Sequence, residues 1–248
     1  MAVDPAGIRR VLAAAKKVKP GQMVFIGLQQ RWGKDYNRAY DMVVNGEIGD
    51  IRMIRSAWLG SDLPRRSGHD PSEEKIRNWL FYKERGGDII VEQHVHNLDV
   101  VQWFTGEHPL SAIGYGARAV RKDIGDIMDS LAVTYKLADG RIWSHSGCQF
   151  SKGRYRDVGE VFFGTKGVIT TSRQGFTVYQ EGKDGPTSVS TKYDITLDLV
   201  ENFIKGVKGE IPHHNAAVYA AESTLTGIMG RIAIELGREV TWDEVFNM

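Results

Sequence analysis

The residues best suited to chemistry lie close together between Gly86 and Asp99. Glu92, His94 and His96 fall within five positions, inside an otherwise apolar stretch. A carboxylate beside an imidazole can exchange a proton with a substrate hydroxyl near neutral pH. The same three side chains on one face could instead hold a divalent metal. The secondary structure of this segment decides between the two chemistries.

Residue spacing favours a helix over a strand here. Apolar residues at positions 90, 91, 94, 95, 98 and 101 follow helical spacing, and the run from 88 to 104 is too long for an ordinary strand. Asp88 can cap the helix, and Gly106 can end it. We therefore predict Glu92 and His96 as a catalytic pair one turn apart. Their polar stripe includes Asp88, Asp99 and Trp103, with His94 on the opposite, apolar side.

The strand interpretation stays open as an alternative. It would place Glu92, His94 and His96 on one face as a three-ligand set for a divalent metal.

Overall composition limits the classes of partner. A net charge of +1, from 32 basic and 31 acidic residues, gives no electrostatic footprint for nucleic acid or an anionic membrane. The single cysteine, Cys148, excludes an internal disulfide and fits a reducing cytoplasm. No apolar stretch is long enough to span a bilayer. We expect a cytoplasmic protein that binds small molecules.

The first thirty residues predict a helix followed by a strand. Asp4 and Pro5 begin an amphipathic helix that continues to Val18, and the apolar run 23–28 is typical of a strand buried in a parallel sheet. We interpret residues 1–30 as a remnant helix–strand unit of a Rossmann-like, doubly wound domain. Residues 31–248 then form a second domain.

The second domain is predicted to be α+β, with a large, mostly antiparallel open sheet covered by helices on one face. A helix over 34–45, a strand over 51–60, a loop over 62–71 and a helix over 72–85 come first. The predicted strands that follow are 110–120, 130–137, 141–150, 157–163, 168–171 and 176–180, and helices over 195–207 and 216–236 close the chain. A sheet face without helices must be polar or covered by another subunit, so we expect a homo-oligomer.

Several motifs in this order resemble the Gfo/Idh/MocA family of NAD(P)-dependent sugar and polyol oxidoreductases. The matching pieces are Asp4-Pro5-Ala6-Gly7, Ile26-Gly27-Leu28-Gln29-Gln30-Arg31-Trp32, Asn45-Gly46-Glu47-Ile48-Gly49-Asp50-Ile51, Gly86-Gly87-Asp88, His96-Asn97-Leu98-Asp99, Gly164-Thr165-Lys166-Gly167 and the terminal Ala221-Glu222-Ser223 to Gly237-Arg238-Glu239-Val240.

The resemblance implies which parts of a family member this chain contains. Family members carry an N-terminal Rossmann domain with a glycine-rich dinucleotide loop and a catalytic Glu-Lys-Pro, and neither pattern occurs here. The nearest glycine pattern, Gly114-Tyr115-Gly116, lies inside a predicted strand. The chain would therefore begin just after the family's catalytic lysine. It would keep the substrate and oligomerisation domain, bind no NAD(P) alone, and need a nucleotide-binding partner chain for hydride transfer.

The family's C-terminal domain also supplies an aspartate and a histidine four residues apart that orient and deprotonate the substrate hydroxyl. These positions correspond to Glu92 and His96, so the acid is one methylene longer than usual.

Further residues could bind a small carbohydrate or polyol. Arg31 and Trp32 follow the first predicted strand, where α/β folds place ligands, although Arg31 could also just anchor a turn. Trp79 suits stacking on a sugar face, and core packing explains it equally well. The remaining predicted contacts are Asp99, His145 and Tyr155, of which His145 could reach the pocket or simply pack inside the sheet.

Three functions remain open at this stage. The first is the substrate-binding and oligomer-forming part of a sugar or polyol oxidoreductase. The second is an acid–base enzyme on carbohydrates that dispenses with NAD, such as a lyase, hydratase or isomerase, and could be metal-assisted. The third is a non-catalytic oligomeric scaffold.

Overall fold

The computed structural model describes residues 1–248 and contains one nine-stranded sheet. The strand order is β8-β7-β6-β5-β1-β4-β3-β2-β9. Neighbouring strands run antiparallel except for β1 and β4, which pair in parallel with Ser56 opposite His145. The strands are β1 Ile51–Leu59, β2 Ser111–Ala117, β3 Ser130–Lys136, β4 Ile142–Cys148, β5 Asp157–Gly164, β6 Gly167–Ser172, β7 Gly175–Gln180, β8 Thr187–Ser190 and β9 Val240–Thr241.

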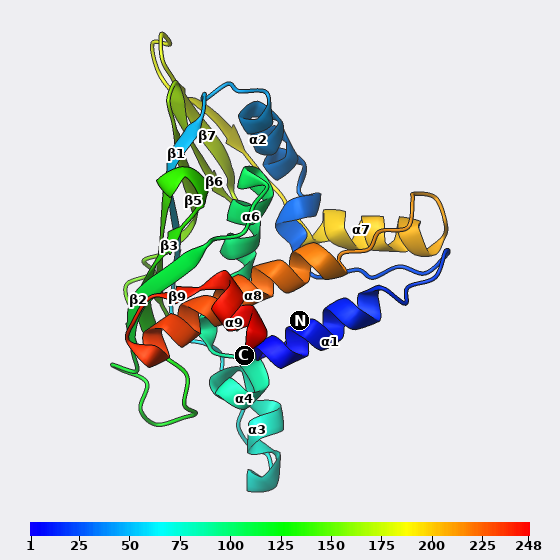
Figure 1. Cartoon of the computed structure of the whole chain (residues 1–248), viewed down its shortest axis with the longest axis vertical. Helices are drawn as coiled ribbons and strands as arrows, with labels where there is room; N and C mark the ends of the chain where they lie inside the picture. Colours follow the sequence, from blue (N-terminus) through cyan, green and yellow to red (C-terminus); the bar gives the residue numbers. More distant parts are fainter.

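The helices cover one face of this sheet, and the opposite face is bare (Figure 1). The long helix α8 crosses behind β2, while α6 lies against β1 and β5 and α2 against β6 and β7. The helices are α1 Pro5–Ala15, α2 Lys34–Val44, α3 Glu74–Arg77, α4 Lys83–Gly86, α5 Ile89–Glu92, α6 Val95–Thr105, α7 Thr196–Val207, α8 Ala217–Leu236 and α9 Trp242–Asn247. The predicted fold class, α+β with helices on one side, is confirmed.

Alternation along the strands explains why one face holds the core. In β3, Leu131, Val133 and Tyr135 point toward the helices and are at most 6% exposed, whereas the residues between them face outward. The same period of two runs through β4, where Trp143 and His145 are buried. The core therefore lies between the sheet and the layer formed by α2, α6 and α8.

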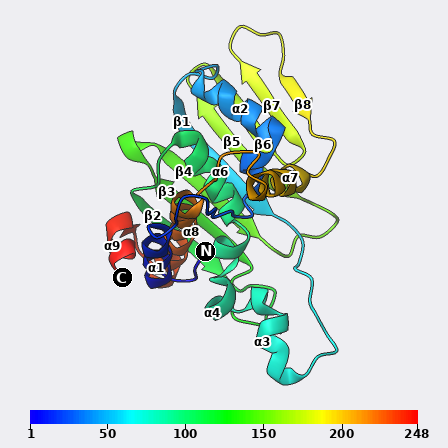
Figure 2. The same ribbon diagram turned by 90° about the vertical axis from the view of Figure 1, so that its right-hand side faces the viewer.

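The N-terminal segment differs from the prediction. Helix α1 forms as expected and packs on α8 and α9, and both chain ends lie on the helical side (Figure 2). The predicted strand over 23–28 is wrong, because Val24 forms only an isolated bridge with Asn215. An apolar run forms a buried strand only when neighbouring strands flank it. Here the backbone of 214–216 is its one neighbour, through Val24 N–H to the His214 carbonyl at 3.0 Å.

Two further segments correct the expected elements. The single helix predicted over 72–85 is broken into α3, α4 and two 3₁₀ turns, because Asn78 bonds the backbone of Arg66 through both of its amide atoms. Short β8 and β9 and the terminal helix α9 were not predicted. The protein contains no helix with both the length and the apolar character needed to cross a membrane.

Candidate active site

The segment predicted as one helix forms α5 and α6, with an irregular turn between them. The His94 N–H donates to the Ile89 carbonyl, five residues back, at 3.1 Å, and the Asn97 N–H donates to the His94 carbonyl, only three residues back. Such π-type turns inside helices occur frequently at functional sites. The predicted helix is thus correct in outline. The irregular turn interrupts it between Glu92, at the end of α5, and His96, in the first turn of α6.

The carboxylate of Glu92 is partly buried and makes no hydrogen bond within the protein. Burial raises its pKa to about 7. The carboxylate therefore titrates in the neutral range, where a general base is most effective.

His96 is positioned by residues from two distant loops. In the orientation that satisfies both ends of its amide, Gln29 donates to His96 Nδ1 at 3.2 Å and accepts from the Arg173 guanidinium at 3.0 Å. Burial and then the charge of Arg173 lower the pKa of His96 to about 4. The imidazole is therefore neutral at pH 7, and Glu92, not His96, is the member of the pair that titrates near neutrality.

Trp58, at the end of β1, is the centre around which these groups gather. Its ring lies 6.1 Å from the His94 ring and 6.0 Å from the His96 ring. The guanidinium carbons of Arg156 and Arg173 lie 5.9 and 5.8 Å from its centroid. We call Trp58, His96, Arg156 and Arg173 the Trp58 cluster. It combines an aromatic ring, a neutral imidazole and two cations.

His94 belongs to a buried chain of hydrogen bonds rather than to a metal site. Trp143 Nε1 donates to Ser56 Oγ at 2.7 Å, Ser56 Oγ bonds His145 Nδ1 at 2.8 Å, and His145 Nε2 bonds His94 Nδ1 at 3.0 Å. Burial lowers the pKa of His145 to about 3 and that of His94 well below its usual value. Both rings are thus held neutral. His145 lies in the core beside the cluster.

The alternative metal set is not assembled. No group of three His, Cys, Asp or Glu side chains in residues 1–248 is arranged to hold a metal ion, and this includes Glu92, His94 and His96. The reason is the helical geometry, which turns His94 toward His145 and away from His96.

The predicted polar stripe does not form one open face, because Asp88 and Asp99 are fully buried. Asp88 accepts the N–H groups of Ile89 and Met128 at its Oδ1, which fixes the start of α5. Burial raises the pKa of Asp88 to about 6. A helical wheel shows which residues share a face but not which other elements cover it.

Asp99 instead forms an ion pair with Arg31. The guanidinium donates from Nε and Nη2 to both carboxylate oxygens at 2.8 and 2.9 Å, and Ser223 donates to Oδ1 at 2.8 Å. The Arg31 guanidinium carbon lies 4.0 Å from the centroid of the Tyr219 ring. Every oxygen of Asp99 has a partner, so the pair anchors the 3₁₀ turn Gln29–Trp32 to α6 and α8.

The other predicted contacts lie outside the Trp58 cluster. Trp32 stacks on Phe25 with 4.7 Å between ring centroids and borders a shallow pocket with His214. Trp79 and Tyr155 are 42% and 58% exposed, and neither makes a side-chain hydrogen bond. Their roles in substrate binding stay predictions.

Sequence reasoning missed a buried glutamate next to the site. Glu160, on β5, is 1% exposed and accepts from Asn97 Nδ2 at 2.6 Å, Thr171 Oγ1 at 2.6 Å and Tyr36 OH at 3.4 Å. Burial raises its pKa to about 7 against these hydrogen bonds. Alternation within β5, between Val158 and Phe162, placed position 160 on the core face and was the one signal available.

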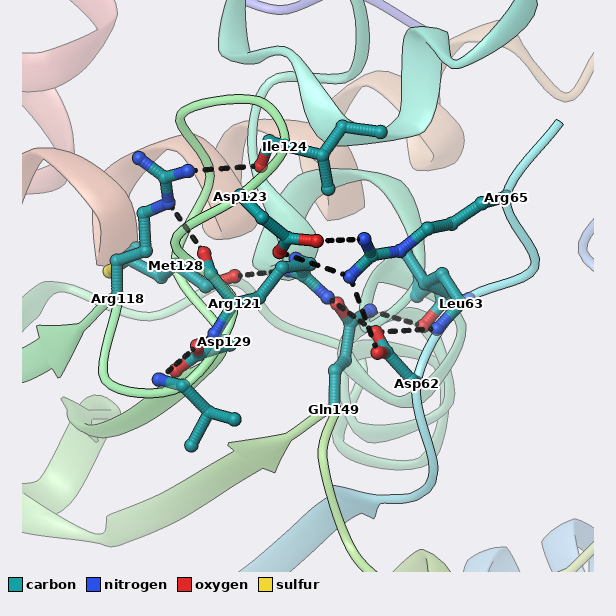
Figure 3. Close-up of polar contacts among 12 residues, drawn as sticks. Asp62, Leu63, Arg65, Arg118, Arg121, Asp123, Ile124, Met128, Asp129 and Gln149 are labelled. Atoms are coloured by element: carbon teal, nitrogen blue, oxygen red, sulfur yellow. Dashed lines mark hydrogen bonds and ion pairs between the residues drawn. The ribbon is translucent and has the colours of Figure 1, made fainter. Parts of the chain in front are cut away.

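A second network fixes the α5–α6 junction from the other side. Figure 3 shows Arg121, whose guanidinium contacts Asp62 Oδ1 at 3.3 Å, the Met128 carbonyl at 2.9 Å and Gln149 Oε1 at 3.1 Å. Gln149 Nε2 then donates to Gln93 Oε1 at 2.6 Å. The loop 118–129 and the end of β4 thereby hold the residue that follows Glu92.

Comparison with known proteins identifies the family. The profile of the GFO/IDH/MocA C-terminal domain matches residues 36–170, more than half of the chain. The chain belongs to the Gfo/Idh/MocA family.

Individual relatives agree with this assignment. Myo-inositol 2-dehydrogenase of Thermotoga maritima is 22% identical over 257 residues, which cover 100% of this chain and 72% of that protein. Inositol 2-dehydrogenase of Rhizobium meliloti is 25% identical over 174 residues, 69% of this chain and 48% of that protein. The structure of a levoglucosan dehydrogenase in complex with NADH and levoglucosan superposes with a TM-score of 0.77 at 15% identity, over 96% of this chain and 72% of that one.

The Gly114-Tyr115-Gly116 pattern does not form a cradle for a nicotinamide dinucleotide. Such a cradle needs a glycine-rich turn between a strand and the N-terminus of a helix. Gly114 and Gly116 instead lie within β2, where a Cβ would stand 2.5 Å from the Ala132 carbonyl oxygen and 2.3 Å from the Met128 sulfur. These glycines allow close packing of β2 on its neighbours.

Proposed function

We propose that this chain is the substrate-binding part of a Gfo/Idh/MocA oxidoreductase and takes a sugar or polyol at Glu92 and the Trp58 cluster. The single observation that carries the proposal is Glu92 itself, a partly buried carboxylate without a protein partner, four residues before His96 in the same helical segment. Buried polar groups are normally hydrogen-bonded, so an unpartnered one at a partly open position suits a ligand. The names of the inositol dehydrogenase relatives suggest a polyhydroxylated ring as that ligand.

The roles of the pair follow from their protonation. Ionised Glu92 would accept a hydrogen bond from a substrate hydroxyl and withdraw its proton, since its pKa of about 7 lies near the working pH. Neutral His96, fixed at Nδ1 by Gln29, would present Nε2 to the same or a neighbouring hydroxyl. The ring of Trp58 is 8% exposed and stacks on His96, and would therefore hold the imidazole in place.

We further infer that residues 1–248 bind no NAD(P) on their own. The support is the absence of a strand–glycine–helix turn around Gly114 and Gly116. Hydride transfer would then depend on a nucleotide-binding partner. Titration of the chain with NAD+, NADH, NADP+ and NADPH, followed by protein fluorescence, should show no saturable binding. Saturation in the micromolar range would contradict this inference.

Calorimetric titration with myo-inositol and glucose tests the substrate site. We expect His96→Ala to weaken binding at least about tenfold, because a hydrogen bond and a ring contact are lost together. The control is His213→Ala, which removes an exposed imidazole far along the chain. Equal losses in both variants, or no polyol binding by the unmodified chain, would contradict the proposed function.

A second candidate is an acid–base enzyme that acts without NAD. The same observation favours it, since a carboxylate with a pKa of about 7 can remove a proton next to a carbonyl. Incubation of the chain with a keto sugar in D2O distinguishes the two candidates. Deuterium incorporation that is lost in Glu92→Gln would favour the acid–base enzyme, and none is expected for a substrate-binding part.

We also propose that a second copy of the chain covers the bare face of the sheet. This face exposes large apolar side chains on five strands, from 37% for Phe163 to 80% for Tyr115. Apolar patches of this kind mark association sites. The exposed residues are Met53, Ile113, Tyr115, Ile142, Phe163 and Tyr179.

Light scattering on a sizing column tests the dimer. Tyr115→Asp should shift the mass toward the monomer, because an unpaired charge would be buried at the interface. Ile76→Asp, on α3 away from the sheet, is the matched control and should leave the mass unchanged. A monomeric unmodified chain would contradict the proposal.

A further inference from the structure

The two arginines of the Trp58 cluster form no ion pair, unlike several other arginines of this protein. Arg31, Arg65 and Arg121 each form an ion pair with an aspartate. Arg156 and Arg173 form none, although both stand over the Trp58 ring. Guanidinium groups held at one aromatic face without counter-ions are a common way to recognise oxyanions.

Arg173 forms no ion pair with a protein carboxylate. The acids whose charges act on its pKa are Asp194 and Glu160. Glu160 already accepts from Asn97, Thr171 and Tyr36, and Asp194 accepts from the backbone of Thr196. The Arg173 Nε–H is buried and has no acceptor at all.

The two cations also oppose each other. Burial, and in smaller part the charge of Arg156, lowers the pKa of Arg173. The charge of Arg173 in turn contributes to lowering the pKa of His96. An anion placed between the guanidinium groups would relieve both effects, because opposite charges favour the charged forms.

We propose that Arg156 and Arg173 form an oxyanion subsite, so that the polyol bound at Glu92 and His96 carries a carboxylate or a phosphate group. This inference rests on the proposed function and names its substrate class as acidic sugars or polyols. The oxyanion of the ligand accepts hydrogen bonds from the guanidinium groups of Arg173 and Arg156, the two cations that lie over the Trp58 ring. Gln29 bonds both Arg173 and His96. One hydrogen-bonded set of side chains therefore contacts the oxyanion and the reacting hydroxyl of the ligand.

A matched pair of ligands tests the subsite by calorimetry at low salt. D-glucuronate and D-glucose share a ring and differ at carbon 6, which is a carboxylate in one and a hydroxymethyl group in the other. We expect glucuronate to bind at least about tenfold more tightly, as charge-assisted hydrogen bonds are the strong ones. Arg173→Gln should remove most of this preference, and Arg156→Gln should reduce it about threefold. The preference is taken as the ratio of glucuronate to glucose affinity within the same variant, so that any loss of affinity common to both sugars cancels.

Arg154→Gln is the control for general charge effects. It removes the same charge from the same loop, two residues from Arg156, at an exposed position. Arg156 is also exposed, so Arg156→Gln should fold normally. If Arg173→Gln is unstable, the comparison of Arg156→Gln with Arg154→Gln still tests the subsite. A change in Arg154→Gln as large as that in Arg156→Gln would overturn the subsite, because screening of the net charge would then explain both.

The remaining outcomes separate this inference from the proposed function. If glucose 6-phosphate replaces glucuronate as the tighter ligand with the same arginine dependence, the subsite is supported and its oxyanion is a phosphate. Equal affinity for glucose, glucuronate and glucose 6-phosphate overturns the subsite and leaves the polyol site standing. Failure of every one of these ligands and of myo-inositol to bind overturns the proposed function and this inference with it.

Discussion

Glu160 and Glu92 both lie between the sheet and its helices, and burial raises the pKa of each to about 7. Their surroundings are opposite. Glu160 is 1% exposed and accepts three side-chain hydrogen bonds, whereas Glu92 is partly open and accepts none. A shifted pKa alone therefore does not identify a functional carboxylate. The lack of hydrogen-bond partners does identify one, because a buried carboxylate with a structural role normally accepts hydrogen bonds from neighbouring residues.

Arg31 and Arg173 differ in the same way as Glu160 and Glu92. Arg31 binds both oxygens of Asp99 and stacks on Tyr219, so its guanidinium is fully used within the protein. Arg173 lies over the Trp58 ring and bonds the Gln29 amide, and its buried Nε–H has no acceptor. We infer that charged side chains paired within the protein, such as Arg31, stabilise the fold. Those without a counter-ion, such as Arg173, are available to a ligand. The following variants test whether this division holds.

The largest expected effect is on the framework side, in Asp99→Ala. Removal of the carboxylate leaves the Arg31 guanidinium, whose side chain is only 18% exposed, without a counter-ion. Breaking a buried pair in this way costs about 3–5 kcal/mol of unfolding free energy. Urea denaturation measures it. Asp41→Ala, at an exposed position of α2 without an ion pair, should cost less than about 0.5 kcal/mol. A loss below about 1 kcal/mol in Asp99→Ala would show that the pair is not structural.

Glu160→Gln should change how stability depends on pH. The folded pKa of about 7 lies above the ordinary value of 4.5, so the folded state binds the proton more tightly. Glu160 therefore contributes stability that is fully present below pH 4.5 and is lost as the pH rises through 7. The loss is up to roughly 3 kcal/mol, at 1.36 kcal/mol for each pKa unit.

Unfolding free energies measured in urea between pH 5 and 8 test this dependence. The stability of the unmodified chain relative to Glu160→Gln should fall as the pH rises, and the two curves should diverge by up to roughly 3 kcal/mol. The neutral His94 and His145 act in the other sense, since their lowered pKa values remove stability as the pH falls below 6.5. They are present in both proteins and cancel in the comparison. Parallel curves would contradict the raised pKa of Glu160.

Gly147→Ala tests the packing behind the site with an intermediate effect. A Cβ at this position of β4 would stand 2.1 Å from His94 Cε1, so the imidazole could not keep its place beside His145. Overpacking of this kind costs about 1–3 kcal/mol. Gly27→Ala is the control, because no atom lies within 4 Å of a Cβ built there. Addition of His94→Ala to Gly147→Ala should recover part of the loss, and equal stability of the two glycine variants would refute the contact.

The sequence predicted the framework better than the site. Alternating apolar residues were enough for the strands from β1 to β7, because each buries one face against the same helical layer. Strands β8 and β9 are short and were not predicted, since polar Thr187–Ser190 has no alternation of this kind. The helix over 88–104 was predicted, but its irregular turn was not. That turn depends on Gly147 and His145, some fifty residues away, which leave room and a partner for the His94 ring.

The same limit explains the errors about individual side chains. Asp88 and Asp99 share a polar stripe in the helical pattern, yet the backbone of Met128 and the guanidinium of Arg31 cover them. Arg173 comes from the turn between β6 and β7, and no local pattern could bring it to Trp58. Glu92 and His96 were named from the sequence, but which of the two titrates near pH 7 depends on burial and on Arg173.

Glu92→Gln gives the smallest change in stability and the sharpest test of the comparison. Because Glu92 has no partner in the protein, its amide replacement should alter the unfolding free energy by less than about 0.5 kcal/mol at pH 4, where the carboxyl is protonated in both the folded and the unfolded state. Ligand binding should respond instead. In the unmodified chain, affinity for myo-inositol should rise as the pH increases through 7, where the carboxylate ionises and becomes a stronger acceptor. In Glu92→Gln this dependence should disappear. If Glu92→Gln instead loses as much stability as Asp99→Ala and keeps its pH-dependent binding, Glu92 serves the fold like Glu160, and unpartnered charge does not mark the ligand site.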